Sequence, residues 1–90
     1  MRVALICNDK PGAGQLRLDH RSAHLAYIAA TEVVELAGPL LDEAGQMCGS
    51  LIVLEVADLA TARGWAAADP YAVAGLFDSV TINAWKKVVG

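Results

Sequence analysis

The hydrophobic residues in the first third of the chain form one continuous run and one helical repeat. Val3-Ala4-Leu5-Ile6-Cys7 is apolar throughout and rich in β-forming residues, which predicts a strand buried on both faces. Asn8 to Gly14 holds turn-forming residues at nearly every position and is expected to be a loop. From Gln15 to about Ala30, apolar residues recur at spacings of three, four and seven, as on one side of a helix. The residues expected on that buried side are Leu16, Ala23, Ala26, Tyr27 and Ala30.

The middle of the chain has the pattern of two strands joined by a tight turn. Val33 to Leu41 predicts the first strand, which Gly38-Pro39 interrupts. Proline has no amide hydrogen to donate to a neighbouring strand, so this strand is expected at the edge of a sheet or with a bulge. In Asp42 to Gln46, a glycine stands where a hairpin turn needs a positive φ. Met47 to Val56 predicts the next strand, which includes another continuous apolar run.

A second helix and a last strand complete the pattern. Asp58 is a good N-cap for a helix from Leu59 to about Ala68. Asp69-Pro70 ends that helix, because the residue before a proline is pushed out of the helical conformation. Tyr71 to Gly75 is expected to add one further turn. Phe77 to Trp85 alternates apolar and polar residues over most of its length, as a half-buried strand does.

The predicted order of elements is strand, helix, strand, strand, helix, strand. This βαββαβ order is typical of the α+β class with a ferredoxin-like fold, in which an antiparallel sheet carries both helices on one face. Ninety residues correspond to a single domain, residues 1–90. Because 56% of the residues are hydrophobic and the helix-free face of the sheet is also apolar, one chain cannot bury all of this surface. We therefore expect a homodimer in which a second copy packs its sheet on the first.

Charge and composition exclude several kinds of partner. The net charge is −3 and no basic run is interleaved with aromatic residues, so nucleic acid is not expected as a partner. No apolar run approaches the roughly 20 residues of a membrane span, so no membrane partner is expected either. The apolar run that follows Met1-Arg2 is too short for a signal peptide and ends at Asn8, which favours the cytoplasm. Cys7 and Cys48 lie in apolar runs and are expected to be reduced and buried.

The predicted first helix carries the most conspicuous polar side chains. Arg17, Arg21 and His24 fall within an arc of about 60° on its surface. We expect Arg17 to lie on a solvated cationic face. His24 has apolar neighbours in the sequence, so it is expected to be partly buried with a partner, in either a structural or a functional role. His20 and His24 have the spacing of a metal-binding pair, but no third ligand clusters with them, so neither a metal nor another cofactor is expected.

Asp69 is the second candidate for chemistry. The C-terminal end of a helix disfavours an ionised carboxylate, and burial would raise its pKa further, which suits an acid or a base. The alternative is that Asp69 only caps nearby backbone amides. In a ferredoxin-like fold the two helices share one face of the sheet, so His24 and Asp69 can meet. The carboxylate would then orient the imidazole and hold one ring nitrogen protonated, while the other nitrogen transfers the proton.

Two further positions belong to the candidate pocket or to the core. Ser50 follows a glycine, but the two flanking glycines of a nucleophile elbow are absent, so a hydrogen-bonding role in a pocket is the better interpretation. Tyr71 and Trp65 suit the core or contact with a ligand. The sequence contains neither a phosphate-binding loop nor a dinucleotide fingerprint.

Several short segments, in this order and at these separations, resemble the YCII-related family of small bacterial α+β proteins. They are Arg21-Ser22-Ala23-His24-Leu25, Ala37-Gly38-Pro39-Leu40, Gly49-Ser50, residues 62–71 and Asn83-Ala84-Trp85. The resemblance implies a ferredoxin-like subunit that pairs into a dimeric α+β barrel, as in muconolactone-isomerase-like enzymes. It also implies a pocket centred on His24 and Asp69, with Ser50 and Gly38-Pro39 at its rim. One activity in the family is a dehydrohalogenase-type elimination on a hydroxylated ring. The segment Asn83-Ala84-Trp85 departs from the family, in which proline often precedes the tryptophan.

Two hypotheses for the function follow. In the first, the protein is an isomerase or lyase acting on a small molecule near the dimer interface, with His24 and Asp69 as the acid/base pair and Arg21 steadying an anionic oxygen; Ser50, Gly38, Pro39 and Tyr71 would contact the substrate. In the second, it is a non-catalytic dimeric domain that binds a small ligand or a protein. If His24 and Asp69 touch and both face an open pocket, the enzyme is favoured. If either is sealed in packing, the binding domain is favoured.

Overall fold

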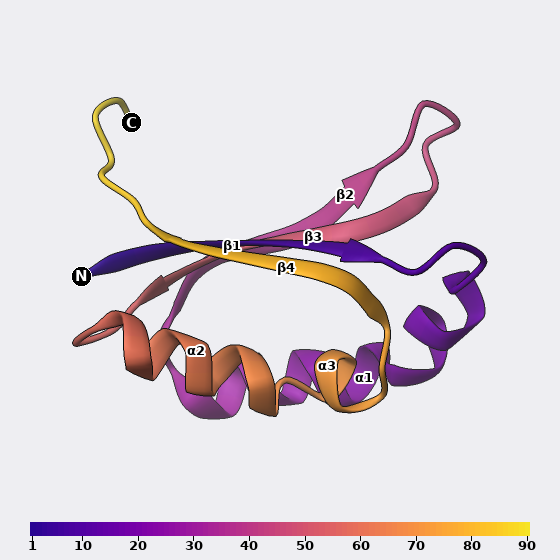
Figure 1. Ribbon diagram of the computed structural model, residues 1–90, viewed down its shortest axis with the longest axis horizontal. Coiled ribbons are helices and arrows are strands. Elements are labelled where there is room, and N and C mark those ends of the chain that lie inside the picture. The colour runs from indigo at the N-terminus through magenta and orange to yellow at the C-terminus, as the bar shows by residue number, and fades with distance from the viewer.

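The computed structural model describes residues 1–90 and shows one antiparallel sheet with the helices on one of its faces (Figure 1). The strands lie in the order β2-β3-β1-β4, and all neighbouring strands are antiparallel. This is the predicted ferredoxin-like α+β fold. The elements are β1 (Arg2–Asp9), α1 (Gly14–Thr31), β2 (Val34–Leu41), β3 (Met47–Glu55), α2 (Leu59–Ala68), α3 (Pro70–Val73) and β4 (Phe77–Ala84).

The local signals at the ends of the elements act as the sequence predicts. The Asp58 carboxylate accepts a hydrogen bond of 2.7 Å from the Thr61 amide and so caps α2. Gly45 adopts a φ of +80° in the hairpin turn, a conformation that costs glycine little. β2 lies at the edge of the sheet, as Pro39 requires. The irregularities in its pairing with β3 lie near the two ends of β2, however, and not at Gly38-Pro39.

The main core lies between the sheet and the helices. Val3, Leu5 and Cys7 of β1 and Ile52 and Leu54 of β3 alternate along their strands and point to the helical side, where each is at most 1% exposed. The prediction that β1 is buried on both faces is therefore correct on one side only. In β1 the residues between these core positions, Ala4 and Ile6, lie on the open face and are half-buried, whereas Val53 of β3, which pairs with Ala4, is 4% exposed.

The orientation of α1 differs from the prediction. Ala23, Ala26 and Ala30 are exposed, and the two buried residues of the helix are Arg17 and His24. Leu16 and Tyr27 are half-buried, and Tyr27 packs against the core, so the prediction holds for these two residues; the helix is turned away from its three alanines and toward Arg17 and His24. An alanine side chain gains little from burial. The specific partners that Arg17 and His24 find below the helix therefore outweigh the weak apolar stripe.

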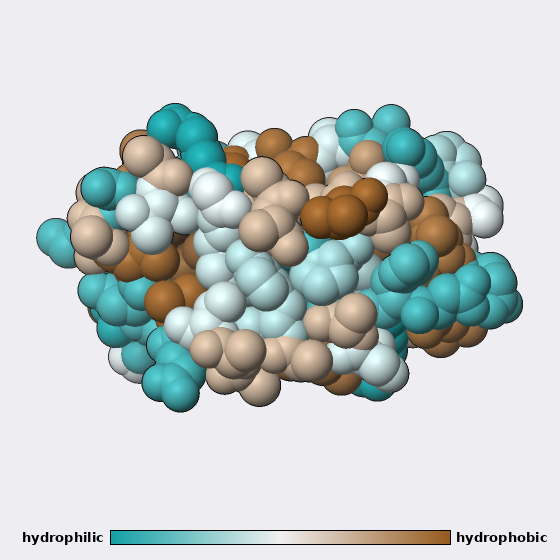
Figure 2. Space-filling view, turned by 90° about the horizontal axis from the view of Figure 1, so that it is seen from below, coloured by the Kyte–Doolittle hydropathy of each residue, from teal (hydrophilic) through white to brown (hydrophobic).

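The two faces of the molecule have different surfaces. Figure 2 views the helical layer from below, and its surface is mostly pale and teal, with brown patches between the polar ones. The opposite face of the sheet carries Ala4, Ile6 and Leu51 at its centre, with Leu36 of the edge strand 52% exposed. None of the helices has the length and hydropathy needed to span a membrane.

Candidate functional site

A cavity of about 130 Å³ lies between α1 and the part of the sheet formed by β2 and β3. Six of the seven site residues predicted from the sequence line it: Arg21, His24, Gly38, Pro39, Ser50 and Tyr71. The seventh, Asp69, lies behind the cavity wall and is 1% exposed. The fold therefore gathers residues from α1, β2, β3 and α3 around one opening.

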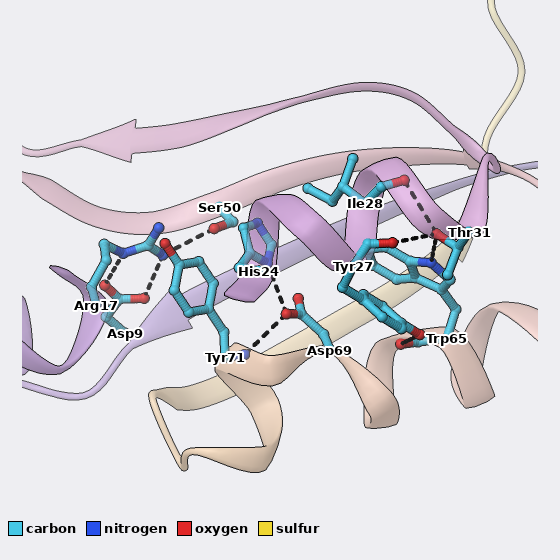
Figure 3. A network of polar contacts seen from close by, with 10 residues as sticks. All are labelled: Asp9, Arg17, His24, Tyr27, Ile28, Thr31, Ser50, Trp65, Asp69 and Tyr71. Carbon is cyan, nitrogen blue, oxygen red and sulfur yellow. Dashed lines mark hydrogen bonds and ion pairs between the residues drawn. The ribbon is translucent and has the colours of Figure 1, made fainter. Parts of the chain in front are cut away.

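His24 and Asp69 are in direct contact. His24 Nδ1 lies 2.7 Å from Asp69 Oδ1, and the two residues are 6% and 1% exposed (Figure 3). The same carboxylate oxygen accepts a hydrogen bond of 3.0 Å from the Tyr71 amide. Asp69 thus caps the backbone and holds the histidine at the same time, which were the two alternatives considered for it. Since α3 begins directly after Asp69, the bond from the Tyr71 amide is the N-cap of α3.

The hydrogen bond to Asp69 determines which nitrogen of His24 faces the cavity. A carboxylate accepts hydrogen bonds when it is ionised, so in the neutral ring the hydrogen is assigned to Nδ1. Nε2 then carries the free lone pair. Every fully buried side-chain nitrogen or oxygen atom in the structure has a partner, and Nε2 has none within the protein. It therefore keeps access to the cavity that His24 lines.

The ring of Tyr71 separates His24 from Arg17. It stacks on the imidazole with 4.0 Å between ring centroids and 16° between planes, and the Arg17 guanidinium carbon lies 4.7 Å from its centroid (Figure 3). Phe77 contacts its edge at 6.0 Å between centroids. Burial raises the pKa of Tyr71 and outweighs the opposite effects of the Arg17 and Arg21 charges, so the hydroxyl stays protonated. Tyr71 therefore fixes the plane of the imidazole without adding a charge.

Arg17 is not on a solvated face, as the sequence analysis expected, but is 3% exposed. Its Nε and Nη2 donate to the two oxygens of Asp9 at 2.7 and 2.8 Å, and Nη2 also donates to Ser50 Oγ at 2.9 Å. Burial alone would lower the pKa of Arg17, but the hydrogen bonds and charge of Asp9 raise it, so Arg17 is charged. Sequence reasoning missed Asp9. The available signal was a carboxylate at the end of a buried strand, one short loop before the helix.

The remaining polar residues of the cavity have distinct settings. Ser50 hydrogen-bonds to Arg17 and to neither a histidine nor a carboxylate, so no base is bonded to it that would make it a nucleophile. Arg21 is exposed at the cavity and forms no ion pair with a carboxylate, unlike Arg17. Pro39 pairs with Ser50 across β2 and β3 and forms the opposite wall with Gly38.

Other candidates from the sequence lie outside the cavity. Trp65 is 7% exposed in the core, and its indole donates to Thr31 Oγ1 at 2.9 Å. Tyr27 donates to the Trp65 carbonyl at 2.8 Å, so these contacts join α1 to α2 close to Asp69. No three His, Cys, Asp or Glu side chains are placed to hold a metal. Burial, with a further contribution from the Asp69 charge, raises the pKa of the Cys7 thiol to about 12, so this thiol is not a nucleophile at neutral pH.

Replacing Arg17 alone should strongly destabilise the protein. Arg17→Met leaves the Asp9 carboxylate buried without a partner, which costs about 3–5 kcal/mol. The double variant Arg17→Met/Asp9→Leu should recover most of that loss, and urea unfolding measures both. Arg2→Met, which breaks the exposed pair of Arg2 with Glu35, is the matched control and should change little. Equal stability of Arg17→Met and Arg2→Met would contradict the structural role of the Asp9–Arg17 pair.

Residues 1–86 of the chain match the YCII-related domain. Protein YciI of Escherichia coli is 33% identical over 97 residues, which cover 98% of this chain and 99% of that protein. An uncharacterized protein of Haemophilus influenzae is 34% identical over 98 residues, with the same coverage. The 5-chloro-2-hydroxyhydroquinone dehydrochlorinase of Burkholderia phenoliruptrix, in complex with 2,5-dihydroxybenzoquinone, superposes with a TM-score of 0.87 at 29% identity, covering 96% of this chain and 94% of the enzyme. The chain therefore belongs to the YCII-related family.

Proposed function

We propose that this protein is an enzyme of the lyase or isomerase type, which moves a proton on a small molecule through the His24–Asp69 pair. The hydrogen bond between these two side chains carries the proposal, because it leaves Nε2 of His24 free beside the cavity. Histidine is the side chain that most often transfers protons in enzymes. The likeness to a dehydrochlorinase over nearly the whole chain supports an enzyme of this general class.

The proposed chemistry is a proton transfer at a carbon next to a carbonyl group. Nε2 of neutral His24 takes the proton, and the electron pair of the broken C–H bond moves to the carbonyl oxygen and forms an enolate. In an isomerase, His24 returns the proton to another atom of the substrate. In a lyase, the enolate re-forms the carbonyl, a new carbon–carbon double bond forms, and the leaving group departs from the neighbouring carbon with its bonding electrons. His24 then gives its proton to the leaving group or to water. Asp69 stabilises the imidazolium that forms in between, and Arg21 attracts the negative oxygen.

The size of the cavity favours a single ring as substrate. A cavity of about 150 Å³ accommodates one benzene molecule, and the cavity here has about 130 Å³. The substrate in the name of the dehydrochlorinase is a chlorinated hydroxyhydroquinone, and the ligand of its complex is a dihydroxybenzoquinone; both are single six-membered rings. We propose cyclic hydroxy-carbonyl compounds as the substrate class for this protein. The proposed reaction calls for no metal or nucleotide, because the proton moves only between the substrate and Nε2 of His24.

The alternative is a non-catalytic binding domain, and the geometry bears on it in two ways. His24 faces the cavity and touches Asp69, which favours the enzyme. Asp69 is sealed in packing, and a sealed partner is what we expected of a binding domain. An orienting carboxylate acts from behind the imidazole, as it does in serine proteases. The burial of Asp69 therefore excludes only the role in which Asp69 itself touches the substrate.

We also propose that two chains pair through the open face of the sheet, which places the cavities near the interface. The face has an apolar centre that no element of this chain covers, with Ile6 and Leu51 paired across β1 and β3 and only half-buried. Sheet-on-sheet packing of two identical faces buries such a surface with two-fold symmetry. The cytoplasm remains the expected compartment.

The catalytic proposal predicts that His24 is required for turnover. In a screen of cyclic hydroxy-carbonyl compounds, with proton exchange into heavy water followed by NMR, His24→Ala and His24→Gln should lose about 100- to 10,000-fold of the rate. Asp69→Asn should lose rate as well, because it no longer fixes the ring tautomer. His20→Gln, on the same helix but outside the cavity, is the matched control and should stay active. Equal rates for His24→Ala and wild type would remove His24 from the mechanism.

The dimer proposal predicts a mass in solution of twice the 9.4 kDa of one chain. Leu51→Lys places a charge at the centre of the open face and should give a monomer by size-exclusion chromatography with light scattering. Leu18→Lys adds the same charge on the exposed side of α1, where Leu18 is 56% exposed, and should remain a dimer. A monomeric wild type, or a dimer that Leu51→Lys leaves intact, would contradict pairing through this face.

A further inference from the structure

The cavity has an unusual balance of hydrogen-bonding groups. Five polar side chains line it, and none is a carboxylate: Arg17, Arg21, His24, Ser50 and Tyr71. The two acidic residues of the site lie one layer back, with Asp9 behind Arg17 and Asp69 behind His24. Apart from His24, whose Nε2 is an acceptor, each of these polar side chains can donate, so they favour a ligand that supplies acceptor oxygens.

Arg17 determines the direction of the Ser50 hydroxyl. Its Nη2 donates to Ser50 Oγ at 2.9 Å, so a lone pair of that oxygen is already occupied. A guanidinium has no acceptor, so the hydroxyl hydrogen of Ser50 cannot point back at Arg17. No hydrogen bond joins Ser50 to Asp9, whose two oxygens accept from Arg17; the bond from Arg17 is the one that Ser50 Oγ makes. Ser50 is 2% exposed and lines the cavity, which is where its free O–H can find an acceptor.

The Tyr71 hydroxyl is in the same situation. Figure 3 shows it beside the Arg17 guanidinium, on the side of the ring toward Ser50. Its hydrogen-bonding neighbour is the Arg17 guanidinium, which can only donate, so the hydroxyl hydrogen itself has no protein acceptor there. Because burial raises its pKa, this hydroxyl keeps its hydrogen. Two unpaired O–H groups therefore lie next to a charged guanidinium at the same end of the cavity, and His24 lies on the opposite face of the Tyr71 ring.

We propose that the hydroxyls of Ser50 and Tyr71, supported by the charge of Arg17, form an oxyanion site for the ionised ring oxygen of a hydroxylated six-membered ring. This inference rests on the proposed function and deepens it, because it names the group of the substrate that the cavity recognises. Two O–H donors beside a fixed positive charge stabilise an enolate or phenolate more than the neutral hydroxyl compound. In the reaction this oxygen begins as the carbonyl of the substrate and becomes ionised when it takes up the electron pair that the proton transfer to His24 releases; the charge of Arg21, which also lines the cavity, adds to the attraction.

The test uses 4-nitrophenol, a single ring with one ionisable oxygen whose visible absorption changes on ionisation near neutral pH. When bound to the wild-type protein, its pKa should fall by about one unit, which corresponds to about tenfold tighter binding of the anion than of the neutral form. Ser50→Ala and Tyr71→Phe each remove one hydroxyl and little else. Each should return the pKa of the bound ligand toward its free value and weaken binding of the anion about tenfold or more.

Two controls separate this inference from the catalytic proposal. Ser22→Ala removes an exposed hydroxyl from α1 and should bind the anion like wild type. His24→Gln removes the base but keeps both hydroxyls, so it should lose turnover while the optical shift of the ligand persists. A bound pKa that is unchanged in wild type, or that is the same in wild type, Ser50→Ala and Tyr71→Phe, would overturn the oxyanion site and leave the role of His24 standing. Failure of 4-nitrophenol to bind the wild type at millimolar concentration would overturn it too.

Discussion

The hydrogen bond between His24 and Asp69 is the contact on which the rest of the site depends. It joins α1 to the junction of α2 and α3, two parts of the chain that are 45 residues apart. Because the imidazole and the carboxylate are both buried, neither could be left unpaired without a large cost. The pair therefore fixes how α1 is rotated against the sheet. It also selects the ring nitrogen that faces the cavity, so one contact determines both packing and chemistry.

A second buried pair repeats this arrangement two turns earlier on α1. Arg17 pairs with Asp9 as His24 pairs with Asp69. The ring of Tyr71 lies between Arg17 and His24 (Figure 3). In each pair the carboxylate is hidden and its partner lines the cavity. The two ends of the cavity therefore differ in chemistry: one presents a base, and the other presents a fixed positive charge with two hydroxyls. The proposed substrate ring would therefore have one favourable orientation, with its acceptor oxygen at the hydroxyl end.

The fold was largely predictable because its signals are local. Asp58 caps a helix and Pro39 keeps β2 at the edge, and each acts through its own neighbours in the sequence. His24 and Asp69 could also be singled out, since each departs from a local rule: a histidine among apolar neighbours and a carboxylate at a helix end. Arg17 could not be singled out in this way, because an arginine on a polar stretch of helix departs from no local rule, and only its contact with Asp9 of β1 shows that it is buried. The predicted burial of the alanines of α1 was wrong for a similar reason. Hydrophobic periodicity treats alanines as buried positions and takes no account of ion pairs with distant parts of the chain.

The most direct test of this account is the tautomer of His24, measured by nitrogen NMR on protein with isotope-labelled histidine. When His24 is neutral, the account predicts a protonated Nδ1 and a bare Nε2, with His20 in the same spectrum as an internal reference. Asp69→Asn should abolish this preference, because an amide oxygen or nitrogen does not select one tautomer as a carboxylate does. A proton on Nε2 of His24 in the wild type, or a tautomer mixture like that of His20, would contradict it.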